Sequence, residues 1–273
     1  GGAEGPIALA GGGWRPVLCD FLPRRSFVGH LRGAFAEAQL GDWRWLCDNR
    51  LPWSRPSPSI PRAAVWIVQD GCACSYGYAG HEWPSAVMEP WFLQLTRAVC
   101  QACGIPDLPN CCNGNRYASG DESVGWHSDD EALFQAAAQD ALIVSLSLGA
   151  TRTFRVRLKD HAAEGDGLVG AEVLLGDGDL CTMEGLCQKH YQHCVPKEAS
   201  VSEPRINLTW RWIVSHGRGC PRGAPEGTPL REKLEALVET RRRLAELKRK
   251  RDAGLPGGTS AATAERLASL AEA

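Results

Sequence analysis

Residues 115–131 contain the side chains best suited to chemistry, with His127-Ser128-Asp129 at the centre of the stretch. In an extended strand, side chains at positions i and i+2 leave the same face. His127 and Asp129 would therefore direct an imidazole and a carboxylate into one pocket, within reach of one metal ion. Two ligands do not hold a catalytic metal, so a third must come from another part of the chain.

A second histidine is the natural third ligand, and His190 and His193 are the candidates. We prefer His193 because it is in phase with Tyr191 and Val195, although spacing alone leaves both histidines open. Two histidines and one carboxylate on one face, with open positions, describe a non-haem Fe(II) oxygenase site. Zinc would instead favour a closed tetrahedral set or a general base beside its water.

Residues 205–212 predict a strand with one polar and one apolar face. Arg205, Asn207, Thr209 and Arg211 fall on one face, and Ile206, Leu208, Trp210 and Trp212 on the other. Guanidinium groups pair with carboxylates through two hydrogen bonds, so two inward arginines suit a dicarboxylate. Beside an iron site, that dicarboxylate would be 2-oxoglutarate, with O₂ as the second co-substrate.

The elements that position these residues are mostly short strands separated by Gly- and Asp-rich turns. Strands are expected at residues 16–21, 63–69, 75–80, 141–148, 153–158, 172–175, 180–183, 192–195 and 205–214. Helices are expected at residues 27–40, from the spacing of apolar side chains, and at residues 91–103, which end before Gly104. Residues 51–61 are rich in proline and predict an irregular loop. The pattern favours a mainly β (α+β) sandwich or barrel with flanking helices.

Charge and hydropathy exclude some classes of protein. The 30 Lys and Arg against 32 Asp and Glu give a net charge of -2, which excludes a strongly basic nucleic-acid coat but not a local basic groove. The longest apolar run, residues 141–148, is far shorter than a transmembrane helix, so no membrane association is expected.

Six of the 12 cysteines form three closely spaced pairs within residues 72–112: Cys72-x-Cys74, Cys100-x-x-Cys103 and Cys111-Cys112. This clustering raises the possibility of zinc. The C-x-x-C spacing does not recur as a pair, however, and the other cysteines lie singly. Reduced thiols of an intracellular protein are the expectation.

The two ends of the chain differ in composition from the middle. Residues 1–13 are rich in glycine and alanine and are expected to be disordered, and residues 253–273 to be a flexible tail. Residues 217–229 read as a linker and residues 230–252 as a charged helix. Its Leu230, Leu234, Leu237 and Leu244 form a partial heptad that Arg241 interrupts. We expect this helix to be solvated, with a binding partner as the alternative. The chain is expected to be a monomer.

His127-x-Asp129, His193 and Arg205-x-Asn207-x-Thr209-x-Arg211 together resemble the signature of the AlkB family of Fe(II)/2-oxoglutarate dioxygenases. The resemblance runs from about Arg15 to about Pro225 and is most specific between Asn115 and Arg211. It implies a double-stranded β-helix (jelly-roll) core at residues 105–216, inside a domain of residues 14–216. It also implies an N-terminal nucleotide-recognition lid at residues 50–90.

The resemblance also implies roles for individual residues. His127, Asp129 and His193 would hold iron, and Arg205 and Arg211 would bind the two carboxylates of 2-oxoglutarate. Asn115, Tyr117, Asn207 and Thr209 would assist the arginines. Trp53, Tyr76, Tyr78, Asp130 and Glu131 match substrate-contacting positions, and aromatic rings suit a base that must be stacked. Tyr76 and Tyr78 could instead simply pack a hairpin, and Trp53 could be a buried anchor.

The function that the resemblance implies is oxidative demethylation of 1-methyladenine or 3-methylcytosine in single-stranded DNA or RNA, in the nucleus and/or cytoplasm. The sequence departs from the family pattern at two places near the expected substrate path. Residues 54–60 do not match the family sequence, and Asn113-Gly114 replaces a pair of apolar residues. The alternatives are an oxygenase of the same fold acting on a protein or small molecule, and a catalytically silent nucleic-acid-binding module.

Overall fold

The computed structural model describes residues 5–78, 80–159, 170–224 and 229–252. The chain divides into two compact units. The larger comprises residues 1–69 and 74–215, and the smaller comprises residues 70–73 and 216–273. Among the described residues, no helix is both long and apolar enough to cross a membrane.

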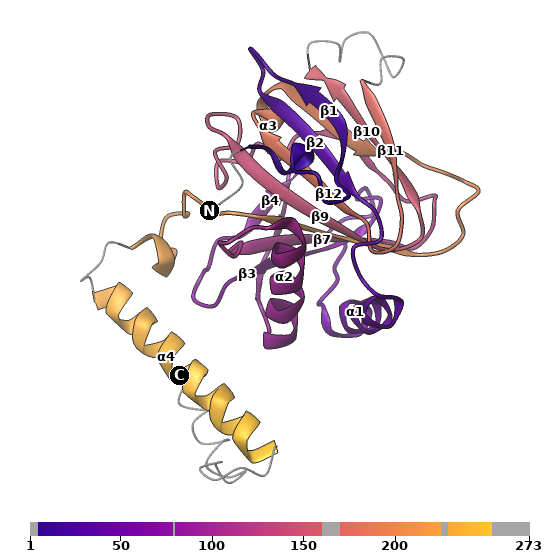
Figure 1. The fold of residues 1–273 in the computed structure, drawn as a ribbon. Coiled ribbons are helices and arrows are strands. Elements are labelled where there is room, and N and C mark those ends of the chain that lie inside the picture. The colour runs from indigo at the N-terminus through magenta and orange to yellow at the C-terminus, as the bar shows by residue number, and fades with distance from the viewer. Residues whose placement is uncertain (1–4, 79, 160–169, 225–228, 253–273) are drawn as a thin grey trace. The chain divides into compact units, whose positions relative to one another are not determined.

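The larger unit is built on two antiparallel sheets, as Figure 1 shows. In spatial order, the eight-stranded sheet consists of β1 (Arg15–Asp20), β2 (Ser26–Leu31), β12 (Leu180–Gly185), β9 (Ala141–Gly149), β14 (Arg205–Arg211), β7 (Cys111–Tyr117), β3 (Ala63–Val68) and β6 (Ser85–Val87). The four-stranded sheet consists of β11 (Ala171–Leu175), β10 (Arg152–Leu158), β13 (Tyr191–Val195) and β8 (Val124–His127). A hairpin of β4 (Tyr76–Tyr78) and β5 (His81–Trp83) completes the strands, and only β6 pairs in parallel among those described.

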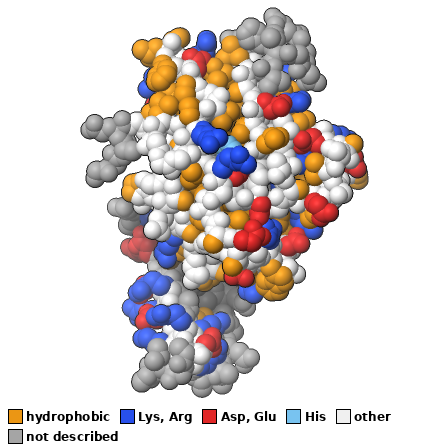
Figure 2. Space-filling model, turned by 45° about the vertical axis from the view of Figure 1, so that its right-hand side comes forward, with side chains coloured by type: hydrophobic (Ala, Val, Ile, Leu, Met, Phe, Trp, Pro, Cys, Tyr) orange, Lys and Arg blue, Asp and Glu red, His pale blue; other side chains and the backbone are white. Residues whose placement is uncertain are grey.

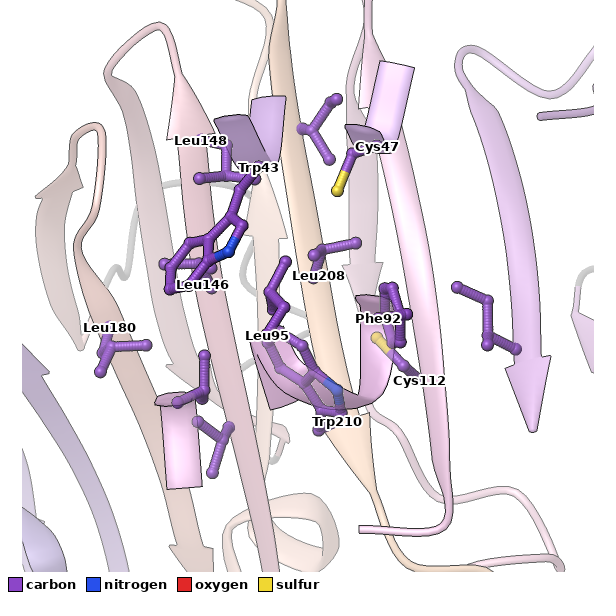
Figure 3. Packing of buried hydrophobic residues seen from close by; sticks show 14 of the residues in the cluster. Trp43, Cys47, Phe92, Leu95, Cys112, Leu146, Leu148, Leu180, Leu208 and Trp210 are labelled. Carbon is purple, nitrogen blue, oxygen red and sulfur yellow. The ribbon is translucent and has the colours of Figure 1, made fainter. Parts of the chain in front are cut away.

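Helices α1 (Glu37–Arg50) and α2 (Pro90–Cys103) pack on one face of the large sheet. Figure 3 shows Trp43 of α1 and Leu95 of α2 against apolar side chains of the sheet, Leu208 and Trp210 of β14 among them. α2 ends where Gly104 adopts a left-handed conformation, as its position predicted. Because the even-numbered residues of β14 fill this core, its odd-numbered residues must point to the other face.

The other face of the large sheet packs against the small sheet. Ile143 and Met183 of the large sheet share a buried cluster with Phe154, Val156 and Val195 of the small one. Two facing antiparallel sheets with helices on the outside confirm the predicted mainly β, jelly-roll architecture. The polar face of β14 therefore lies between the sheets.

The helix expected over residues 27–40 is wrong in its first half. Phe27 lies in β2, and helix α1 begins only at Glu37. Residues 26–30 are all buried, because β2 is paired on both sides and covered on both faces. Their sequence therefore shows neither the hydrophobic period of a helix nor the alternation of a half-buried strand. The strand expected over residues 205–214 ends earlier, at Arg211, and Val214 is exposed.

The disorder expected over residues 1–13 does not hold for the part that the structure describes. Ile7–Leu9 form a short 3-10 helix, η1, and Ala8 is buried. The backbone N–H groups of Ile7 and Ala8 donate to the carboxylate of Glu184, at 2.7 and 3.0 Å. A buried carboxylate needs such donors, which explains why this segment docks. Residues 1–4 and 253–273 lie outside the described residues.

The smaller unit contains η3 (Pro221–Gly223) and helix α4 (Pro229–Asp252). Ion pairs one turn apart run along α4, such as Arg243 with Glu239 and Lys250 with Glu246. They fit the charged helix that the sequence predicts. The side chains of Leu230, Leu234 and Leu237, three of the four leucines of the partial heptad, lie outside the described ones, as does that of Arg241, which interrupts it. A helical contact with a partner stays a proposal.

Arg152, at the start of β10, is a buried guanidinium that fastens the loops flanking β8 and β13. Its Nε donates to Glu198 at 2.8 Å, and its remaining nitrogens donate to the carbonyls of Ser119, Glu122 and Pro196. Burial alone would raise the pKa of Glu198, but the hydrogen bonds from Thr153 and Arg152 lower it overall. Because β8 ends at His127 and β13 contains His193, this network supports both histidines.

Replacing Arg152 should therefore destabilise the fold far more than replacing Arg155, the exposed arginine of the same strand that pairs with Glu172. We expect Arg152→Ala to lower the free energy of unfolding by about 3 kcal/mol, because it removes the cation paired with the half-buried Glu198 and the donor to several backbone carbonyls. Arg155→Ala should cost less than about 1 kcal/mol. Urea denaturation measures both, and equal losses would contradict the assignment.

The same network predicts a pH dependence. Since the folded-state pKa of Glu198 lies below its ordinary value of 4.5, its contribution is present above that pH and is lost as the pH falls through the lowered value. The stability difference between the wild type and Glu198→Gln should thus be largest near neutral pH and should shrink in acid. A difference that grows on acidification would be inconsistent with this pairing.

Candidate metal and co-substrate site

The structure brings His127, Asp129 and His193 together between the two sheets. β8 pairs with β13 so that His127 lies opposite His193, and Asp129 follows directly after β8. The Nε2 atoms of His127 and His193 lie 3.7 and 4.0 Å from the carboxylate oxygens of Asp129. These three side chains form a group that could hold a metal ion. His190, the alternative candidate, ends the short helix α3 (Cys187–His190) and is not part of the group.

Both histidines are in the form that binds a metal. Burial lowers the pKa of His193 to about 3, with the charge of His127 acting in the same direction. Burial also lowers the pKa of His127. The Nδ1 of His127 lies 2.8 Å from the carbonyl oxygen of Gly125, which can only accept a hydrogen bond. Nδ1 must therefore carry the proton, which leaves the Nε2 lone pair facing the group.

Asp129 is held ionised by Arg211 of β14. The Nε and Nη2 atoms of Arg211 donate to Oδ2 at 3.0 and 2.5 Å. Burial alone would raise the pKa of Asp129, but the charge of Arg211 and its hydrogen bonds lower it to about 2. The other oxygen, Oδ1, is buried and has no hydrogen-bond partner among the described residues. This orphaned anionic oxygen fits a metal ligand.

The two arginines of β14 also have donors without acceptors. Arg205 is fully buried, and its Nη2 donates to Ser147 at 2.8 Å. Its Nε and Nη1, and the Nη1 of Arg211, lack partners within the described part of the chain. An unpaired buried guanidinium donor is costly, so these three positions call for an anionic acceptor. The predicted dicarboxylate fits them.

The four residues predicted to assist the arginines lie on neighbouring strands and line the same cavity. β7 pairs with β14 so that Tyr117 lies opposite Arg205 and Asn115 opposite Asn207. Thr209 donates to the amide oxygen of Asn207, whose nitrogen donates to Ser145 at 2.6 Å. These contacts fix the orientation of the Asn207 amide beside the arginines.

Of the residues predicted to contact the substrate, Tyr76 and Glu131 lie beside the metal ligands. The Tyr76 hydroxyl donates to Glu131 Oε1 at 2.5 Å, and the Tyr76 ring stacks on Trp66 with centroids 5.0 Å apart. Glu131 Oε2 is buried and has no partner among the described residues. Burial and the nearby charge of Asp129 raise the pKa of Glu131. Glu131 thus has an unused hydrogen-bonding atom next to the cluster.

The other three substrate candidates are placed differently. Asp130 is exposed and accepts a hydrogen bond from Lys159 at 3.0 Å. Trp53 packs against Gly114 on the helix-covered face, and its indole N–H donates to the carbonyl of Cys47. The structure therefore supports the buried anchor for Trp53, because Gly114 and the cavity-lining Asn113 and Asn115 alternate across β7. The side chain of Tyr78 lies outside the described ones.

Sequence reasoning missed several residues that line the cavity or support its side chains. The buried Arg62 donates to the amide oxygen of Asn115 at 2.6 Å, and Gln188 accepts a hydrogen bond from the backbone N–H of Asp129. Ser145 and Ser147 of β9 hold Asn207 and Arg205. The alternation of serine and leucine over residues 145–148 could have revealed the serines. Arg62 follows a proline-rich loop and had no periodic signal.

The protonation states predict how metal affinity depends on pH. The pKa values of His193 and Asp129 lie at about 3 and about 2, so neither gains a proton between about pH 6 and about pH 8, and the pKa of His127 lies below its ordinary value of 6.5. The affinity for Mn(II), measured by titration without oxygen, should therefore fall by less than about fourfold between about pH 8 and about pH 6, the loss that one histidine of ordinary pKa would cause. A larger loss at about pH 6 would mean that a ligand titrates at or above the ordinary histidine value.

Comparisons with known proteins agree with this geometry. Residues 45–211 match the 2OG-Fe(II) oxygenase superfamily. The chain is 33% identical over 198 residues to alpha-ketoglutarate-dependent dioxygenase alkB homolog 3 of Homo sapiens, covering 68% of this chain and 66% of that protein. It is 42% identical over 197 residues to the Mus musculus protein of the same name, covering 69% and 67%.

Two further similarities extend the comparison. The chain is 32% identical over 191 residues to DNA oxidative demethylase ALKBH2 of Homo sapiens, covering 68% of this chain and 65% of that protein. It thus spans about two thirds of the length of these curated relatives. A solved structure of OsALKBH1 matches with a TM-score of 0.50 at 18% identity, covering 67% of this chain and 97% of that chain, which bears on the fold alone.

The superfamily match and the group of His127, Asp129 and His193 mean that the protein is a dioxygenase that uses Fe(II), 2-oxoglutarate and O₂. The orphaned oxygen of Asp129 and the unpaired arginine donors fit that pair of bound groups. Given this site, its jelly-roll fold and its similarity to the AlkB homologues, the chain belongs to the AlkB family of the 2OG-Fe(II) oxygenases.

Proposed function

We propose that the protein catalyses the oxidative demethylation of N-alkylated bases, such as 1-methyladenine and 3-methylcytosine, in single-stranded DNA or RNA. The observation that carries the proposal is the Tyr76–Glu131 pair, which lies directly beside the metal ligands and leaves one carboxyl oxygen of Glu131 unused. Tyr76 lines the same cavity as the three metal ligands, so a base held in that cavity would lie close to this pair.

The roles proposed within the site follow from the unused atoms. His127 and His193 would bind iron through Nε2, and Asp129 through Oδ1. Arg205 and Arg211 would bind the carboxylates of 2-oxoglutarate through the donors that lack partners. When bound, iron and 2-oxoglutarate supply the oxidant. The net reaction converts 2-oxoglutarate, O₂ and an N-methyl group into succinate, CO₂ and an N-hydroxymethyl group, which then releases formaldehyde.

The surroundings of Glu131 suit an alkylated base. Methylation of N1 of adenine or N3 of cytosine leaves the base positively charged, so a carboxyl group beside it is favourable. The ring of Tyr76 lines the cavity and is backed by the buried Trp66, on which it stacks. Enzymes that act on a base take it out of the stack and hold it by hydrogen bonds and ring contacts. The Tyr76–Glu131 pair offers both.

Two further observations favour a nucleic-acid substrate. One relative is named as a DNA oxidative demethylase. Figure 2 shows Lys and Arg side chains gathered beside a histidine near the centre of one face. A local basic patch of this kind can hold a phosphate backbone on a chain whose net charge is slightly negative. We further propose that the protein acts on single strands as a monomer. Its proposed location is the nucleus and/or cytoplasm.

Replacing the proposed iron ligand His193 should abolish turnover, whereas replacing its neighbour His190 should not. Purified protein is supplied with Fe(II), 2-oxoglutarate and methylated single-stranded oligonucleotides, and formaldehyde and succinate are measured. We expect His193→Ala to lose at least about a thousandfold in rate, because the metal loses one of three ligands. His190→Ala should stay within about twofold of the wild type.

Each competing function gives a different result in this assay. An oxygenase acting on a protein or small molecule would form no formaldehyde from any methylated oligonucleotide. A catalytically silent binding module would retain the oligonucleotide without turning over 2-oxoglutarate. Parallel reactions on single-stranded DNA, duplex DNA and RNA would identify the preferred strand.

The adjacent carboxylates Glu131 and Asp130 give a matched test of the substrate contact. Glu131→Gln should lower kcat/KM for methylated oligonucleotides by about tenfold to a hundredfold, because a hydrogen bond to a charged base is weakened. Turnover of 2-oxoglutarate without substrate should be unchanged. Asp130→Asn, at an exposed position, should have an effect of about twofold. A larger effect for Asp130 than for Glu131 would place the base elsewhere.

A further inference from the structure

Two groups of side chains that could bind a metal occur among the described residues, and the second is separate from the iron site. It consists of Cys72, Cys74, His216 and Cys220. Three of these, Cys72, His216 and Cys220, belong to the smaller unit of the chain. The thiols are buried, and the histidine is half-buried. Nothing in the dioxygenase reaction requires three cysteines, so the group needs its own explanation.

The distances within the group match those of a tetrahedral zinc site. With zinc–sulfur bonds of about 2.3 Å and zinc–nitrogen bonds of about 2.0 Å, two ligand sulfurs should be about 3.8 Å apart, and a sulfur and a nitrogen about 3.5 Å apart. The Sγ atoms of Cys72 and Cys220 are 3.7 Å apart. The Nδ1 of His216 is 3.7 Å from Cys72 Sγ and 3.4 Å from Cys220 Sγ.

A disulfide does not account for the same distances. A disulfide bond is about 2.05 Å long, so the sulfurs of Cys72 and Cys220 would have to move together by more than about 1.5 Å. All the described cysteines, these included, are thiols in the structure. Three groups that meet at one point, with the spacing of ligands, are better explained by an ion between them than by a bond between two of them.

Local structure supports His216 and Cys220 as ligands from one turn. The backbone N–H of Cys220 donates to the carbonyl of Gly217, and Gly219 has a φ of 83°, so the chain turns back within the H-x-x-x-C segment. Gly223 lets the chain pass His216, since a Cβ there would lie 2.7 Å from His216 Cβ. The backbone N–H of Ala73 donates to Cys220 Sγ at 3.3 Å. Such a donor stabilises a thiolate ligand.

Nearby charges would balance such a site. Zinc with three thiolates and one neutral imidazole carries a net charge of −1. The positive charges of Arg222 and Arg231 both act on His216. Arg222 also donates two hydrogen bonds to the carbonyl of Asp70, at 3.0 and 2.5 Å, which ties its segment to the loop that contains Cys72.

The C-x-x-C pair of α2, by contrast, lacks these features. Cys100 and Cys103 are both buried in α2. Neither belongs to a potential metal group among the described residues. The spacing that most resembles a zinc motif in the sequence is therefore not where the structure assembles ligands.

We propose that Cys72, His216 and Cys220 bind a structural zinc ion, with Cys74 as the fourth ligand. Cys74 follows Cys72 by two residues, so the chain itself keeps its thiol within reach, and it belongs to the same group of potential ligands. Four protein ligands leave no open position, so the site is structural rather than catalytic. The ion fixes the loop of residues 70–73 to the segment that leads into α4.

Metal analysis of the purified chain tests the proposal independently of turnover on oligonucleotides. Every protein carries His193→Ala, so that zinc does not occupy the iron site, and is grown with added zinc. We expect about one zinc per chain, and at least tenfold less in Cys220→Ser and His216→Ala. Cys19→Ser, at an exposed thiol, and Cys100→Ser, in the helical pair, should retain the full amount.

X-ray absorption at the zinc edge needs no further variant and covers the case in which Cys220→Ser does not fold. It should show three sulfur neighbours at about 2.3 Å and one nitrogen at about 2.0 Å. Zinc-free protein, zinc retained in full by Cys220→Ser, or a Cys72–Cys220 disulfide found by mass spectrometry would each overturn the proposal. A loss of zinc from Cys100→Ser alone would do so as well.

Discussion

The buried ion pair between Arg211 and Asp129 is the contact on which the rest of the site depends. Placing a carboxylate between two sheets is unfavourable unless a cation accompanies it. Arg211 supplies that cation, occupies one oxygen of Asp129 and leaves the other oxygen, which lies 3.7 Å from the Nε2 of His127, without a hydrogen-bond partner among the described residues. Asp129 is thus ionised and keeps one oxygen without a hydrogen-bond partner in the described part of the chain. These two properties together suit it to bind a metal.

The alternation of β14 explains how an arginine can be buried there. Leu208 and Trp210 anchor one face of the strand in the helix-covered core. Arg205 and Arg211 are on the opposite face of the strand and therefore point into the interior between the sheets. Neighbouring strands then supply partners for Arg205: Tyr117 of β7 lies directly opposite it, and Ser147 of β9, which lies opposite Asn207, accepts a hydrogen bond from it. These partners do not satisfy every donor of the two guanidinium groups. The donors that lack partners among the described residues would bind a dianion.

The sequence predicted this part of the molecule well because its signals are local. The period of β14, the His127-x-Asp129 spacing and the phase of His193 each depend on residues a few positions apart. The placement of Trp53 could not be predicted, because it depends on Gly114 across the sheet. The group of Cys72, His216 and Cys220 was missed for the same reason, since its halves are joined only in the folded chain. Strand β2 was mistaken for part of a helix because it is buried on both faces, whereas β1 was predicted correctly.

The central claim is that the unpaired donors of Arg205 and Arg211 receive 2-oxoglutarate, and calorimetry tests it most directly. 2-Oxoglutarate is titrated into the Mn(II)-loaded protein without oxygen, for the wild type, Arg205→Met and the exposed control Arg155→Met. Loss of a buried, charge-assisted pair should weaken binding about tenfold to a hundredfold in Arg205→Met and leave Arg155→Met unchanged. Equal affinities in all three proteins would contradict the account.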